Sequence, residues 1–158
     1  MNERGVVLSI QLSKGDRQPP VSVEETRALV GHGLEGDKHG KRRANTGRQV
    51  LLADRRSLEA FGFAPGALRE QLTVDFLGLD SLPAGTRLRV GEAILEISGP
   101  CAPCEGIGLI NAVDDPNAFR DALAGRRGVA ARVMAAEGGG RIRRGDEVVV
   151  EVGERVSG

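Results

Sequence analysis

The sequence predicts a mainly β protein, built as a barrel of short strands with a few short helices. Three observations predict this fold: short apolar runs recur along the chain, glycine-rich turns separate them at intervals of roughly ten residues, and only two stretches carry helix-start signals. The 158 residues are close to the usual size of one domain. We therefore expect a single domain over 1–158, with a core of about 5–152 and a frayed tail at 153–158.

The first half of the chain alternates strands with polar stretches. Residues 6–12 alternate apolar and polar side chains, as a half-buried strand does, and a second extended segment covers 21–30. Residues 31–47 are polar, rich in glycine and without a period, so we expect a long loop there. A buried strand follows at 49–53, and Asp54 is placed to cap a short helix that ends at Phe61.

The second half carries clearer turn signals. Gly91-Glu92 between two apolar runs predicts a hairpin, and Asp115-Pro116 predicts a helix start, with the helix running to Gly125. Three glycines at 138–140 predict a turn. The remaining expected strands are 72–76, 88–90, 93–98, 129–134 and 148–152.

Composition excludes several classes of function. Twenty-two basic and 22 acidic residues give a formal net charge of zero, which argues against a non-specific nucleic-acid binder. There is no Trp or Tyr and there are only four Phe, so bases have few rings on which to stack. No signal peptide or apolar membrane span is apparent, and we expect a cytoplasmic protein that does not bind membranes. Both cysteines should then be reduced, without a structural disulfide.

Both cysteines lie three residues apart in the turn Gly99–Gly106, directly after a strand. A thiolate in such a turn is suited to carry a persulfide or ligate a metal. Two alternatives remain open. A dithiol redox pair has the Cys-x-x-Cys spacing, but Gly106 and Gly108 discourage the helix that such a pair normally opens. A zinc site completed by His32 and His39 lacks the usual ligand spacing. Cys101 and Cys104 are otherwise two small buried apolar residues, but a Pro/Gly turn makes full burial less natural.

Basic and amide side chains gather at three expected strand ends and in the long loop. The loop segment 33–43 contains three glycines together with Arg42 and Arg43, so it is suited to hold an anion or is simply a solvated surface loop. Arg48-Gln49, Arg69–Gln71 and Arg126–Gly128 each open a strand. Each alone is typical of surface residues, but a barrel would bring strand ends together.

The chain resembles the MOSC domain family, found at the carboxyl end of molybdenum-cofactor sulfurases and as small bacterial proteins. The motifs occur in the family's order over roughly residues 5–152. They are Gly33–His39, Arg48–Leu52, Arg69–Val74, Gly85–Ala93, Gly99–Cys104, Gly128–Val133 and Ile142–Asp146.

The resemblance implies a β-barrel that binds molybdopterin. The family's cysteine follows a proline, so Cys104 is implied as the residue that carries sulfur or ligates molybdenum, and Cys101 as a further catalytic candidate. Gln71 departs from the family's asparagine, which weakens its assignment to the pocket. The resemblance implies Asp37, His39, Arg48 and Gln49 as cofactor-binding residues. We add Arg42 and Arg43 of the basic loop and Glu70 as further cofactor-binding candidates.

Three functions follow as hypotheses. The first is a cofactor-binding sulfur carrier, supplied by a cysteine desulfurase or another sulfur donor and serving a molybdenum-cofactor acceptor protein. The second is an enzyme that reduces N-hydroxylated compounds through bound molybdenum cofactor, with Asp37 or His39 moving protons. The third is a non-catalytic zinc or interaction domain. We expect no pyridoxal phosphate on this chain, because its three lysines lack a suitable context, and we expect a homodimer that covers a sheet edge.

Overall fold

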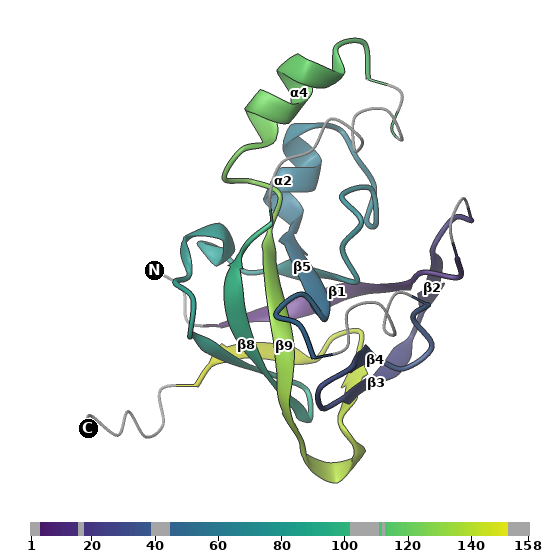
Figure 1. Cartoon of the computed structure of the whole chain (residues 1–158), viewed down its shortest axis with the longest axis vertical. Helices are drawn as coiled ribbons and strands as arrows, with labels where there is room; N and C mark the ends of the chain where they lie inside the picture. The colour runs from purple at the N-terminus through teal and green to yellow at the C-terminus, as the bar shows by residue number, and fades with distance from the viewer. Residues whose placement is uncertain (1–3, 16–17, 39–44, 102–110, 112, 152–158) are drawn as a thin grey trace.

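The structure, a computed structural model, describes residues 4–15, 18–38, 45–101, 111 and 113–151. In this part of the chain seven strands close into a barrel in the order β11-β7-β8-β9-β5-β6-β1 (Figure 1). The ring closes where the start of β1 pairs antiparallel with β11. The barrel strands are β1 (Arg4–Leu12), β5 (Val50–Asp54), β6 (Leu72–Asp75), β7 (Arg87–Val90), β8 (Ala93–Pro100), β9 (Val129–Ala136) and β11 (Glu147–Val150). The predicted mainly β fold is confirmed.

Four further strands lie outside the ring. β2 (Val21–Val23) extends the sheet beside β1, and β10 (Arg141–Arg143), β3 (Glu25–Leu29) and β4 (Gly33–Leu34) form a second, three-stranded sheet. The sequence did not predict β4 or β10. They span only two and three residues, and β10 has a single fully buried side chain, so neither is long enough to show an alternating pattern.

The hairpin and both helix starts are confirmed. In the hairpin, Val90 of β7 pairs with Ala93 of β8. Asp54 caps α2 (Arg55–Ala60), and Asp115 caps α4 (Pro116–Leu123) through a 3.1 Å bond from the Ala118 amide. The second helix ends at Leu123, two residues before the expected end. Within the described residues, no helix has the length and apolar character needed to cross a membrane.

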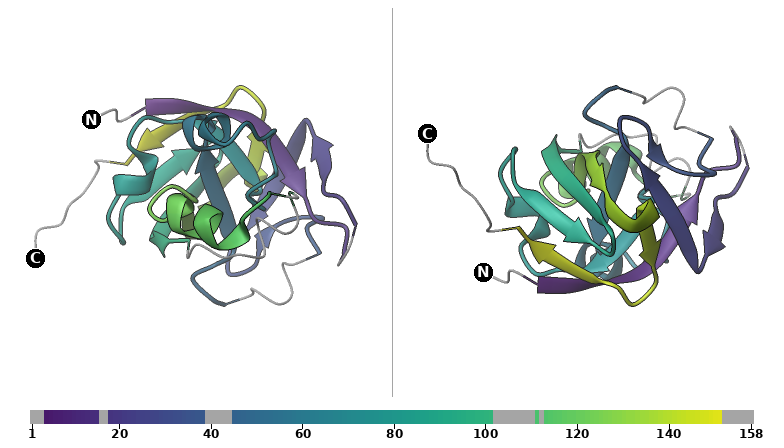
Figure 2. Two further views of the ribbon diagram at one scale, coloured as in Figure 1. Left: turned by 90° about the horizontal axis from the view of Figure 1, so that it is seen from above. Right: turned by 90° about the horizontal axis from the view of Figure 1, so that it is seen from below.

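Strand β5 occupies the middle of the fold and is buried along its whole length. It pairs in parallel with β6 on one side and antiparallel with β9 on the other. Val50 and Leu52 belong to the interior of the barrel, whose strands curve around a common core in both views of Figure 2. Ala53 belongs instead to an outer cluster with residues of α2 and α4, and Leu51 to a smaller outer cluster. Residues that precede β5 and β6 are therefore held close together at one end of a rigid strand pair.

Candidate functional site

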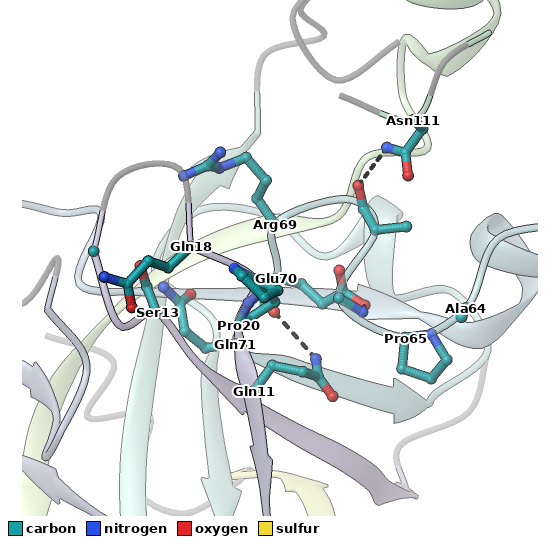
Figure 3. Close-up of a pocket in the computed structure, with 14 residues that line it drawn as sticks. Gln11, Ser13, Gln18, Pro20, Ala64, Pro65, Arg69, Glu70, Gln71 and Asn111 are labelled. Atoms are coloured by element: carbon teal, nitrogen blue, oxygen red, sulfur yellow. Dashed lines mark hydrogen bonds between the residues drawn. The ribbon is translucent and has the colours of Figure 1, made fainter. Parts of the chain in front are cut away.

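A cavity of about 650 Å³ opens beside the barrel, between the end of β1 with its following turn and the segment that leads into β6 (Figure 3). This volume is in the usual range for small-molecule sites. One wall is apolar, with alanine and proline side chains, and the other carries amides, a carboxylate and a guanidinium. The lining residues are Gln11, Ser13, Gly15, Gln18, Pro19, Pro20, Ala64, Pro65, Gly66, Ala67, Arg69, Glu70, Gln71 and Asn111.

Gln71 ties the cavity wall to β5 and to Asp37. Its Oε1 accepts from the Leu51 amide at 2.7 Å, and its Nε2 donates to Asp37 Oδ2 at 3.3 Å. The other Asp37 oxygen accepts from the Ser13 amide at 2.6 Å, so this buried carboxylate lies directly behind two lining residues. Gln71, whose assignment to the pocket its departure from asparagine weakened, does line this cavity, and its longer amide makes both contacts at once.

Glu70 is almost completely buried, with 3% of its surface exposed. Its carboxylate accepts from the Gly66 amide at 2.9 Å, the Leu68 amide at 3.1 Å and the Thr73 hydroxyl at 2.7 Å. Burial raises the pKa of the Glu70 carboxyl above its ordinary value, and these three hydrogen bonds oppose that rise. The Glu70 carboxylate therefore stabilises the fold of its own segment, by accepting two backbone amides and one hydroxyl.

Arg69 lies between these two residues in sequence but is exposed to solvent at the cavity wall. Its backbone is left-handed, with φ +64°. Among the described residues its guanidinium has no hydrogen-bond or ion-pair partner. Figure 3 shows the side chain on the same side of the cavity as Gln18. Arg69 therefore leaves five N–H donors for a bound anion.

The predicted pair Arg48-Gln49 does not line this cavity. Gln49 is buried on the opposite flank of β5, where it accepts from the Val133 amide at 2.9 Å and donates to the Thr46 carbonyl at 2.9 Å. It borders a smaller hollow of about 260 Å³. Arg48 is exposed, and its guanidinium has no partner within the described part of the chain.

The expected convergence of three basic strand starts is wrong for one of them. Because β9 runs antiparallel to β5, Arg126–Gly128 lie at the carboxyl end of β5, whereas Arg48-Gln49 lie at its amino end. Only the start of β6 joins the start of β5, because those two strands are parallel. Strand direction, which local sequence does not encode, decides which ends meet.

Cys101 is 4% exposed and packs against Leu51 and Ala130. The expectation that a Pro/Gly turn disfavours burial is wrong here, because β8 continues to Pro100 and keeps Cys101 against the neighbouring strands. The predicted residues His39, Arg42, Arg43 and Cys104 lie outside the described residues. Asn111, with which the described chain resumes, donates from Nδ2 to the Ala67 carbonyl at 2.9 Å in the cavity wall.

No metal-binding cluster is found within the residues that the structure describes. There, no group of three or more His, Cys, Asp or Glu side chains is placed to hold a metal ion. His32, one candidate zinc ligand, is half-buried in the turn before β4. The zinc hypothesis also involves His39 and Cys104, so it stays a prediction.

The fold is thus a closed β-barrel with a cavity beside it that has one apolar and one polar wall. The MOSC domain family model matches residues 39–149, well over half of the chain, and the protein belongs to the MOSC family. No curated protein matches the chain.

Solved structures agree on the fold. YuaD from Bacillus subtilis superposes with a TM-score of 0.76 at 20% identity, covering 93% of this chain and 95% of that one. YiiM from Escherichia coli gives 0.68 at 19% identity, covering 94% and 70%. YiiM from Geobacillus stearothermophilus gives 0.68 at 20% identity, covering 92% and 74%. At these identities the likeness concerns the fold.

Proposed function

We propose that this MOSC protein binds the molybdenum cofactor in the cavity beside β6 and carries sulfane sulfur on Cys104 for transfer to a metal cofactor. One observation carries the cofactor half of the proposal. The cavity of about 650 Å³ combines amide side chains with an arginine that has no partner among the described residues. The family's association with molybdenum cofactor supplies the ligand class.

The lining residues fit a phosphorylated pterin. Gln18 carries an exposed amide, which both donates and accepts hydrogen bonds as the edge of a pterin ring requires, whereas Gln71 and Asn111 shape the polar wall through their bonds to the protein. Arg69 offers the planar fork that suits a phosphate group. The described lining contains no aromatic ring, so hydrogen bonds and charge hold the ligand. When bound, the cofactor supplies a molybdenum centre with exchangeable oxygen and sulfur ligands.

Cys104 performs the sulfur chemistry in this proposal. Its thiolate attacks the terminal sulfur of a donor persulfide, such as that of a cysteine desulfurase, and the donor's S–S bond breaks. A persulfide forms on Cys104 and the donor cysteine leaves as a thiolate, so no external oxidant is needed. The stretch that contains Cys104 begins after Cys101, which packs on Leu51, and ends at Asn111 in the cavity wall.

Purification from a host that makes molybdenum cofactor tests the proposal. We expect molybdenum and a pterin to copurify with the wild-type protein, and Arg69→Gln to retain much less of both. Arg126→Gln is the matched control, because Arg126 is also exposed but does not line the cavity. A wild-type protein without molybdenum and pterin, or equal retention by Arg69→Gln, would contradict cofactor binding here.

Sulfur transfer is tested separately by mass spectrometry after incubation with a desulfurase and cysteine. We expect one added sulfur atom on the wild-type chain and on Cys101→Ala, and none on Cys104→Ala. Labelling of Cys104→Ala equal to the wild type would remove the persulfide role. The reductase hypothesis is assayed on the same cofactor-loaded sample with an N-hydroxylated substrate, and absence of turnover would count against it.

A further inference from the structure

The segment before β6 takes an unusual backbone path at the cavity wall. Among the described residues only Asn45 and Arg69 combine a side chain with a positive φ. A left-handed conformation is unfavourable for a long side chain such as arginine, and it persists only where neighbouring groups hold it. Something in this segment therefore fixes Arg69 in a conformation that it would not choose by itself.

The Glu70 carboxylate makes the contacts that fix this conformation. It accepts the amides of Gly66 and Leu68, which lie three and one residues before Arg69. The Arg69 amide donates to the Gly66 carbonyl at 2.9 Å, closing the turn from the other side. The carboxylate thus draws the backbone on both sides of Arg69 together.

Glu70 is itself anchored to the barrel. The Thr73 hydroxyl of β6 donates to Glu70 Oε2 at 2.7 Å, and Gln11 Nε2 of β1 donates to Thr73 Oγ1 at 3.1 Å and to the Glu70 carbonyl at 3.2 Å. The Ser9 hydroxyl donates in turn to Gln11 Oε1. A buried chain of hydrogen bonds therefore connects two barrel strands to the turn that carries Arg69.

We propose that Glu70 is a positioning residue that holds Arg69 in the left-handed conformation and so presents its guanidinium to an oxyanion, rather than a residue that binds the ligand itself. The proposal rests on the proposed function insofar as the natural oxyanion is the cofactor's phosphate. It changes the role expected for Glu70 from the sequence. The carboxylate is 3% exposed and already receives three donors, so it is poorly placed to receive a ligand.

Sulfate binding measured by calorimetry or NMR titration tests the proposal, because sulfate stays a dianion throughout the titration. We expect Glu70→Gln to weaken sulfate binding about tenfold, because an amide cannot accept all three donors. A purely electrostatic role predicts the opposite sign, since removing a negative charge next to Arg69 would strengthen anion binding. Unchanged or tighter binding by Glu70→Gln would therefore overturn the proposal.

A double-mutant cycle separates positioning from general destabilisation. Arg69→Gln should also weaken sulfate binding about tenfold, and the double variant should bind no more weakly than Arg69→Gln alone, because both changes remove the same contact. Independent losses that add in the double variant would contradict the mechanism, as would a wild-type protein that does not bind sulfate. Glu59→Gln, at an exposed glutamate of α2, is the matched control and should bind like the wild type.

Two further measurements keep the proposal testable if Glu70→Gln folds poorly. Thr73→Val removes one donor to the Glu70 carboxylate and should weaken sulfate binding. Thr73→Ser keeps the hydroxyl and should bind sulfate like the wild type. Scalar couplings of the Arg69 amide report its φ directly, and they should leave the left-handed range in Glu70→Gln. Failure of the proposed function would give a different result. Sulfate binding would still depend on Arg69 and Glu70, but no molybdenum or pterin would copurify with the protein.

Discussion

The two flanks of β5 are held by the same kind of side chain but surround different spaces. On the β9 flank, Gln49 accepts from the Val133 amide, and on the β6 flank, Gln71 accepts from the Leu51 amide. Both glutamines are 3% exposed. Gln49 borders a hollow of about 260 Å³, whereas Gln71 borders the cavity of about 650 Å³. Burial and hydrogen bonding alone therefore do not distinguish a structural amide from a site residue.

The difference comes from what each flank adds to its glutamine. The β6 flank adds Asp37, Glu70 and Arg69, two buried carboxylates and one exposed cation, around a turn that leaves space open. On the β9 flank the start of the strand packs tightly against β5, because Gly128 lies against the Leu52 carbonyl. This close packing lies at the carboxyl end of β5, whereas the smaller hollow lies beside Gln49 at the amino end. The two flanks therefore differ in that the β6 flank combines its glutamine with buried carboxylates and an exposed arginine around the larger cavity.

The largest effect is expected where β9 closes on β5. Gly128 has φ +105°, and a Cβ there would collide with the Leu52 carbonyl and lie 3.1 Å from the Ala53 Cα. Both obstacles are backbone atoms, which cannot turn aside. We expect Gly128→Ala to lower the free energy of unfolding by at least about 3 kcal/mol, measured by urea denaturation.

Gly125 supplies the matched control in the same loop. It also has a positive φ, +75°, but an added Cβ would meet nothing within 4 Å. Gly125→Ala should therefore cost only about 1 kcal/mol, the conformational cost of a left-handed alanine. If the two variants were equally stable, close packing at the β9 flank would not be what Gly128 provides.

The two glutamines allow the comparison to be tested directly. Gln71→Leu and Gln49→Leu each remove the acceptor of a buried strand amide, so each should lower the free energy of unfolding by about 2–3 kcal/mol. Only Gln71→Leu should also reduce molybdenum and pterin retention, measured on folded protein at equal concentration. Reduced retention by Gln49→Leu instead would place the ligand on the β9 flank, as the sequence prediction for Gln49 implies.

These residues also show what local sequence can predict. Caps, turns and the hairpin depend on neighbouring residues, so Asp54, Asp115 and Gly91-Glu92 were identified correctly. Pairing between distant strands was not visible, and neither was the parallel direction of β5 and β6 that joins Gln71 to Leu51. The left-handed conformation of Arg69 was missed because local sequence carries no signal for it, although its motif was noted. The burial of Cys101 likewise depends on strands that are distant in sequence.

A smaller effect is expected at Asp80, where η1 (Leu79–Ser81) meets the β9 flank. Its carboxylate accepts from the Gly128 amide at 2.8 Å. Burial raises the Asp80 pKa, and the nearby Asp54 charge raises it further. The stability contribution of Asp80 is therefore complete below its unfolded pKa and is lost as the pH rises through its higher folded pKa.

Asp80→Asn should flatten this decline, which thermal melts across the acidic range will measure. Ser57→Ala should have the opposite effect, because the hydrogen bond from Ser57 lowers the Asp80 pKa and its loss would raise it further. Identical slopes for Asp80→Asn and the wild type would show that other carboxyls, Glu70 among them, govern the acid dependence. Opposite changes in the two variants would therefore assign the pH dependence of stability to Asp80.

The smallest effect is expected on the outer face of the barrel beyond the β9 flank. Glu96 of β8 lies between Arg132 of β9, at 2.7 Å, and Arg87 of β7, at 3.2 Å. The hydrogen bond from Arg132 lowers the Glu96 pKa most, and the hydrogen bond from Arg87 lowers it further. The stabilisation by Glu96 is therefore present at neutral pH and is lost as the pH falls through the lowered folded pKa. Both guanidinium groups are about half exposed, and solvent screens the attraction.

Glu96→Gln should therefore cost no more than about 0.5 kcal/mol at neutral pH, and added salt should reduce even that difference. Urea denaturation at low and high salt measures both quantities. A loss as large as that of Gln71→Leu would mean that exposed ion pairs hold the β8–β9 side as firmly as buried amides hold β5. Cofactor retention should be unchanged, because Glu96 lines neither the cavity nor the smaller hollow. The variant thus separates strand pairing on the outer face from binding on the β6 flank.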